Sequence, residues 1–178
     1  MIFLVWFGLS VLGALLHLSI QRKTPRTNAR VIEVLLLYFL AVYYGFAAFV
    51  SGLGHLVLGD QQAEYIGWPA GNPFQDEFAF ASLGLATLGI LAIWLRGTFW
   101  IAPALGYSIL LLEAAYVHIR EIVVAGNLAP GNAGPVLFFD VLVPVIVLGL
   151  LVAHRRLGPA EGWEGRDPAK GCPGRDSD

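Results

Sequence analysis

Residues 2–20 read IFLVWFGLSVLGALLHLSI and contain no Asp, Glu, Lys or Arg. The hydrocarbon core of a bilayer is about 30 Å thick, so a helix needs roughly 20 apolar residues to cross it. A helix that is apolar on every side lies either in a protein core or in a membrane. We therefore expect residues 2–20 to form a membrane-spanning helix.

The composition of the whole chain agrees with this expectation. Of 178 residues, 57% are hydrophobic and 13% are charged, and the mean hydropathy is +0.68. Soluble domains carry about 25% charged residues. A net charge of −2 gives no reason to expect a nucleic-acid partner. The single cysteine, Cys172, cannot form an internal disulfide.

Four further apolar runs follow the first, and polar or Gly/Pro-rich segments separate them. They cover residues 31–58, 77–95, 99–124 and 136–153. The runs are continuous rather than alternating, which argues against a β-barrel. The sequence thus predicts an all-α integral membrane bundle of about five transmembrane helices within residues 1–156. The polar, Gly/Pro-rich segment 157–178 is expected to be a disordered cytoplasmic tail.

Basic residues predict the orientation of the bundle, because they concentrate on the cytoplasmic side of a membrane. With five spans, the basic loop 21–30, Arg96 and the Arg155-Arg156 pair all fall on one side, whereas the loop 59–76 has no Lys or Arg. Arg120 is the exception. The basic loop follows the first run instead of preceding it, unlike a cleavable signal peptide. We expect a multi-pass protein of the cell (inner, cytoplasmic) membrane with its N-terminus outside and its C-terminus in the cytoplasm.

Ionisable residues within or beside the apolar runs are the candidates for chemistry. Five fall in the outer half of the predicted bundle: His55, Glu77, Glu113, His118 and Asp140. Glu113 stands out, because a charge in mid-bilayer costs about 2.5–3.5 kcal/mol on insertion scales and must pair, protonate or face a wet cavity. The sequence leaves two interpretations open: a functional proton-handling or metal site, or interhelical hydrogen bonds that only hold the bundle together.

A metal site would use His55, Glu113 and His118, because histidine and carboxylate ligands suit zinc, iron or manganese. The chain has no His-Glu-x-x-His motif and no paired cysteines that would support it.

Two Gly/Pro-rich loops lie on the predicted outer side: GWPAGNPFQ at 67–75 and GNLAPGNAGP at 126–135. Either they fold over the mouth of the bundle, or they are ordered connectors without a ligand. In the first case they would rim the polar cluster with five side chains: Trp68, Asn72, Gln75, Asn127 and Asn132.

The loop 67–75, the glycine-bearing run LGLATLGIL at 83–91, and Arg96-Gly97 before another apolar run resemble the DoxX-like group of small membrane proteins. The chain is also similar to uncharacterised small bacterial and archaeal integral membrane proteins with a Trp-Pro-Ala-Gly-Asn-Pro-Phe-Gln loop. The resemblance covers about residues 45–153. It implies a four-helix core with one added helix, the first, and a loose association with quinone-linked respiration and redox stress.

Three functions remain in competition at this stage. The first is a non-enzymatic bundle, either an accessory subunit or a binder of a small ligand or lipid, partnered by the bilayer and by other membrane subunits or a second copy. The second is a membrane redox or enzyme component that uses the His/Glu/Asp cluster with a quinone or divalent metal. The third is a proton-coupled transporter, which the absence of an inverted repeat disfavours.

Overall fold

A computed structural model describes residues 2–21 and 24–158. These residues form helices and contain no β-strand. Nearly all of the predicted tail, from residue 159 onward, lies outside the described residues. The elements are α1 (Ile2–Ile20), α2 (Asn28–Tyr38), η1 (Phe39–Ala47), α3 (Ala48–Val57), α4 (Gly59–Ile66), α5 (Phe74–Leu91), η2 (Gly97–Trp100), α6 (Ile101–Ala125) and α7 (Pro135–Leu157).

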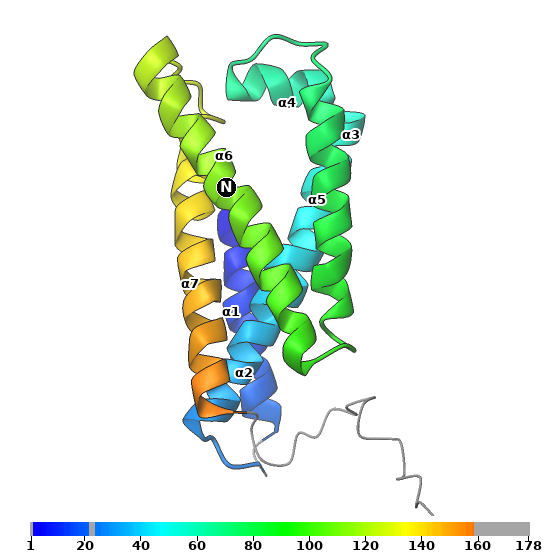
Figure 1. Cartoon of the computed structure of the whole chain (residues 1–178), viewed down its shortest axis with the longest axis vertical. Coiled ribbons are helices and arrows are strands. Elements are labelled where there is room, and N and C mark those ends of the chain that lie inside the picture. Colours follow the sequence, from blue (N-terminus) through cyan, green and yellow to red (C-terminus); the bar gives the residue numbers. More distant parts are fainter. Residues whose placement is uncertain (1, 22–23, 159–178) are drawn as a thin grey trace, which may run out of the picture.

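The chain runs up and down the bundle in five long segments (Figure 1). α2, η1 and α3 follow one another without a break, so Asn28–Val57 is one helical segment of 30 residues. The Thr27 side chain accepts a hydrogen bond from the Arg30 amide and caps its start. η1 is a π-helix in the middle of this segment. α4 is short and lies across the end of the bundle opposite to the α1–α2 connection.

The predicted spans match the helices closely, with two corrections. The predicted loop 59–76 contains the helix α4. This helix ends at Gly67, which adopts a left-handed conformation with φ 85°. α4 is polar and has eight residues, so no apolar run marked it. At the other end, His154, Arg155 and Arg156 form the last turn of α7 instead of stopping it before residue 154. Cations are favourable in the last turn of a helix, because they face its unpaired carbonyls.

Among the described residues, three helical segments are long and apolar enough to cross a membrane: Ile2–Ile20, Asn28–Val57 and Pro135–Leu157. They indicate a membrane protein. α5 and α6 do not join this set, and both carry polar residues, with Asp76 and Glu77 in the first turn of α5 and Glu113 within α6. The prediction of five spans is therefore supported only in its coarser form, an all-helical chain with three candidate spans.

Small residues bring α5 against η1 and α3. A Cβ atom built on Gly89 would lie 2.7 Å from the Gly45 nitrogen and 2.7 Å from the Leu40 oxygen. Further along, the Ser82 hydroxyl donates to the Ala48 carbonyl at 3.2 Å. A Cβ on Gly52 would meet the Ala79 oxygen at 3.1 Å. Backbone-to-backbone approach of this kind fixes the distance between two helices that share no apolar driving force in lipid.

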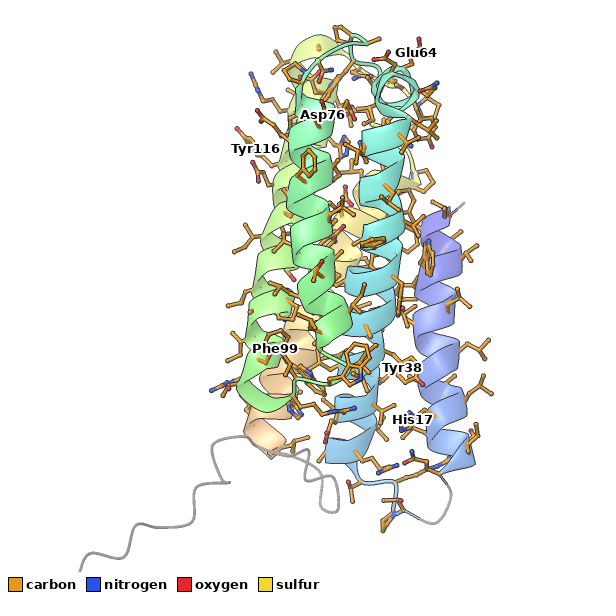
Figure 2. All side chains as sticks on the ribbon, turned by 90° about the vertical axis from the view of Figure 1, so that its right-hand side faces the viewer. His17, Tyr38, Glu64, Asp76, Phe99 and Tyr116 are labelled. Atoms are coloured by element: carbon orange, nitrogen blue, oxygen red, sulfur yellow. The ribbon has the colours of Figure 1, made fainter. Side chains whose placement is uncertain are left out.

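The first helix is peripheral. Its buried residues are Ser10, Ala14 and Leu18, all on one stripe, while its other faces carry exposed leucines. Figure 2 shows α1 at the edge of the bundle beside α2 and η1. This placement agrees with the added helix that the family resemblance implied.

A charged layer closes the end of the bundle at the α1–α2 connection. Arg30 and Glu33 on α2 are both buried. Burial lowers the pKa of Arg96 in the α5–η2 turn below its ordinary value, and the nearby Glu33 carboxylate opposes that shift. The Arg96 guanidinium carbon lies 5.7 Å from the Trp100 ring centroid, which in turn lies 5.3 Å from His154 on α7. Charge and ring contacts thus tie α2, the α5–α6 connection and α7 together at this end.

Replacing Gly89 with alanine tests the close contact. Because the added Cβ would meet backbone atoms that cannot rotate away, we expect Gly89→Ala to destabilise the protein by ~1–3 kcal/mol. Gly84→Ala on the same helix is the matched control, since no atom lies within 4 Å of its Cβ position. It should leave stability unchanged or raise it by up to about 1 kcal/mol. Thermal unfolding in detergent measures both, and equal effects of the two substitutions would contradict this packing.

Candidate functional site

A cavity of about 690 Å³ lies in the half of the bundle that α4 covers. Its walls come from α1, η1, α3, α4, α5, α6 and α7. Figure 1 shows the reason for its position: α5 and α6 lie close at their connecting turn and diverge toward α4, which lies across the opening. The size falls within the range of about 300–1,000 Å³ that is typical of small-molecule sites.

All five predicted cluster residues line this one cavity. His55 comes from α3, Glu77 from α5, Glu113 and His118 from α6, and Asp140 from α7. The structure therefore brings together residues up to 85 positions apart in the sequence. Their shared position on the cavity wall is observed, and their functional role stays a prediction.

His118 and Asp140 form a buried polar contact on the cavity wall. Both side chains are buried, and His118 Nε2 lies 3.6 Å from Asp140 Oδ2. That distance is too long for a hydrogen bond. Asp140 Oδ2 is buried and has no hydrogen-bond partner among the described residues. The contact thus leaves a carboxylate oxygen on the cavity wall able to accept a further donor.

Asn132 fixes the orientation and tautomer of His118. Its amide nitrogen donates to the carbonyl oxygens of Asn127 at 2.8 Å and of His118 at 3.3 Å. The Asn132 amide oxygen therefore faces His118 Nδ1 at 2.7 Å and accepts a hydrogen bond from the Nδ1–H group. Because Nδ1 donates to Asn132, the other ring nitrogen, Nε2, is the one that faces the Asp140 carboxyl group. An imidazole and a carboxyl group thus lie beside each other on the cavity wall.

His55 lies on the opposite wall. Its Nδ1 is 2.7 Å from the amide oxygen of Gln75, and its ring packs edge-on against Phe78 with centroids 4.6 Å apart. Gln75 is buried, and its amide nitrogen has no hydrogen-bond partner among the described residues. Gln75 thus holds the His55 ring by a hydrogen bond, although Gln75 itself does not line the cavity.

Glu77 and Glu113 are the exposed members of the cluster. Within residues 2–21 and 24–158, neither carboxylate makes an ion pair or a side-chain hydrogen bond. Both therefore keep their full capacity to accept hydrogen bonds or to face a positive charge at the cavity wall.

The structure does not assemble the predicted metal ligands. In the part of the chain that is described, no three His, Cys, Asp or Glu side chains are placed to hold a metal ion. His55, Glu113 and His118 share the cavity without forming a ligand group.

The two Gly/Pro-rich loops meet beside the cavity. The Asn127 side chain donates to the Ile66 carbonyl at 3.0 Å, and the Gly131 amide donates to the Tyr65 carbonyl at 3.0 Å. These bonds hold the C-terminal end of α4 against the α6–α7 loop. α4 is therefore attached to both sides of the cavity, on one side through the chain itself and on the other through these bonds.

Of the predicted rim residues, Trp68 lines the cavity. Gln75 and Asn132 do not line it but bond to the lining residues His55 and His118, and Asn127 joins the α6–α7 loop to the end of α4. Asn72 does not take part. Its side chain donates to the Pro69 carbonyl and accepts from the Phe74 amide, so it is used within its own turn. Asparagine commonly bonds to its own local backbone in this way, which explains the wrong prediction for this residue.

Several lining residues were missed by sequence reasoning. Tyr43 and Tyr107 reach the wall from η1 and α6, and Gln61 and Gln62 reach it from α4. The Tyr107 hydroxyl lies 3.3 Å from Ser82 Oγ, and the neighbouring Tyr44 and Ser108 hydroxyls are 2.8 Å apart. The available signal was the polar pair Tyr107-Ser108 within an apolar run. For the glutamines there was none, because α4 itself was not predicted.

Comparison with known proteins gives a family but no function. No curated protein and no solved structure matches the chain. The likeness to the DoxX-like group is not shown by these comparisons and stays a prediction. One family model, described as a family of unknown function (DUF6790), matches residues 1–160. That match covers the whole helical bundle, and the chain belongs to this family.

Proposed function

We propose that this chain is a five-span membrane protein that binds an amphipathic small molecule, a lipid or a lipid-like compound, in the cavity beneath α4. The observation that carries the proposal is the cavity itself. Its walls are mostly apolar and aromatic, and polar side chains from α3, α4, α5, α6 and α7 converge on it. This combination is typical of ligand sites, in which apolar walls give affinity and sparse polar groups set the orientation.

The outward-facing side chains support five spans. Large apolar residues are exposed on α5 and α6 as well as on the three apolar segments; Phe80 on α5 and Ile109 on α6 are each 64% exposed. Continuous apolar surface of this kind is rare on soluble monomers and is accommodated by lipid. With five spans, Arg26, Arg96 and Arg155 lie at one end, which we assign to the cytoplasm. The cavity then faces the outer half of the membrane.

Binding is favoured over transport because the cavity ends in a dry core. Leu36, Leu40, Val143, Val147 and Trp100 are fully buried between the cavity and the charged layer around Glu33 and Arg96. None of them lines the cavity. A transporter would need a polar path from one side to the other.

A membrane enzyme or redox component is the second candidate function. The buried His118–Asp140 contact, with its tautomer set by Asn132, is an arrangement that could pass a proton to a bound quinone or lipid. Turnover with a defined substrate would favour this candidate, whereas binding without turnover favours the first.

Cysteine labelling tests the five spans and the orientation together. In a Cys172→Ala background, Ala70→Cys in the α4–α5 loop and Thr98→Cys in η2 both present exposed positions. A membrane-impermeant maleimide added to intact cells should label Ala70→Cys and leave Thr98→Cys unlabelled, because five spans separate them by one membrane crossing. Labelling of both before lysis would mean that α5 and α6 do not cross, and the three-span alternative would replace the proposal.

A cavity-filling substitution tests ligand binding. Ala114 on α6 lines the cavity, whereas Ala102 on the same helix is exposed and does not. Ala114→Phe should expel a bound molecule by occupying its volume, and Ala102→Phe is the matched control. Native mass spectrometry of the protein released from mild detergent should show a retained adduct in the parent and in Ala102→Phe, and its loss in Ala114→Phe. The same adducts on all three proteins would place any ligand elsewhere and contradict the proposal.

A further inference from the structure

Apart from two histidines, the ionisable side chains on the cavity wall are acidic. The lining includes three carboxyl groups, on Glu77, Glu113 and Asp140, and two histidines, but no lysine and no arginine. Arg120, two turns beyond Glu113 on α6, is exposed and does not line the cavity. Even if His118 and Asp140 compensate each other, Glu77 and Glu113 leave the wall negative. An anionic headgroup would therefore be repelled.

The carboxyl groups on this wall accept no hydrogen bond from side chains among the described residues. Glu77 and Glu113 have no side-chain partner among the described residues, and the buried Asp140 Oδ2 accepts no hydrogen bond there. Asp140 is nine-tenths buried and lines the cavity. Carboxylates in or near an apolar medium are costly unless a positive charge or a donor lies beside them. A bound cation would supply that partner.

Aromatic rings complete the surroundings that a cation would meet. Eight side chains on the wall, from five elements and the α4–α5 loop, present aromatic rings: Phe3, Trp6, Tyr43, Tyr65, Trp68, Phe74, Phe78 and Tyr107. Trp68 and Phe74 pack edge-to-face with centroids 5.2 Å apart. The faces of such rings attract ammonium groups, and this attraction grows when water is excluded.

The size and chemistry of the cavity distinguish an organic cation from a metal ion. A volume of about 690 Å³ with largely apolar walls suits a molecule with a substantial apolar part. The described residues also offer no three-ligand group for a metal. We propose that the cavity takes an amphipathic organic cation, an amine or quaternary ammonium group carried on an apolar chain. This inference rests on the proposed ligand-binding function and specifies its ligand class.

The test compares three probes with the same brominated dodecyl tail and different headgroups: trimethylammonium, hydroxyl and sulfate. The protein carries Trp94→Phe, because Trp94 is exposed to lipid, and is held in zwitterionic nanodiscs. Bromine quenches nearby tryptophans, and Trp6 and Trp68 line the cavity. We expect the trimethylammonium probe to quench at the lowest concentration. The sulfate probe should quench the parent protein no more than it quenches Ala114→Phe, in which the phenylalanine fills the cavity and only partitioning into the lipid remains.

Variants separate charge selection from binding itself. Glu77→Gln and Glu113→Gln should each raise the half-saturating concentration of the trimethylammonium probe about fivefold. Glu64→Gln is the matched control: Glu64 is an exposed acid on α4 at the same end (Figure 2) but outside the cavity lining, so its effect should stay below about twofold.

Each other outcome has a defined meaning. Equal saturation by the cationic and hydroxyl probes, unaffected by the glutamate variants but lost in Ala114→Phe, would overturn the ligand class and leave the proposed binding function standing. Tighter binding of the sulfate probe would also overturn the class. Quenching by no probe beyond the Ala114→Phe level would overturn the class and the proposed function together.

Discussion

The close backbone contact between Gly89 on α5 and Gly45 in η1 determines how the rest of the bundle is arranged. It holds α5 to the long Asn28–Val57 segment, while α6 packs along α7. The two helix pairs are joined at the α5–α6 turn, where the charged layer and Trp100 fill the space. From that turn the pairs diverge toward α4 (Figure 1), and the cavity lies between them. Tight packing at one place thus creates the opening at another.

Much of this architecture could be predicted from the sequence. Apolar runs locate the long helices to within a few residues, because a run of about 20 apolar residues has few other uses. The rarity of ionisable side chains in those runs also singled out His55, Glu77, Glu113, His118 and Asp140, which share one cavity. Charge in an apolar run is costly, and a cavity or a partner lessens that cost.

What could not be predicted depends on tertiary contacts. α4 is polar and short, and it is held by bonds from Asn127 and Gly131, residues about 60 positions away. Tyr43 and Tyr107 look like ordinary interface aromatics until the packing of α5 places them on a wall. The role of Asn132 depends on which of its two amide atoms faces His118, and only its other two hydrogen bonds decide that. The function of the cluster likewise depends on the ligand of the cavity, which a pattern of residues in the sequence does not identify.

The π-helix η1 separates the long second segment into two parts with independent helical phase. The part before it is oriented by contacts with α1 and α7, and the part after it by contacts with α5. A π-helical stretch is wider than an α-helix and holds extra residues within the same turns, so it absorbs a difference in register. The faces that carry Glu33 and His55 therefore need not follow a single α-helical repeat along this segment. One continuous helical segment can in this way present His55 to the cavity and Glu33 to the charged layer at the opposite end.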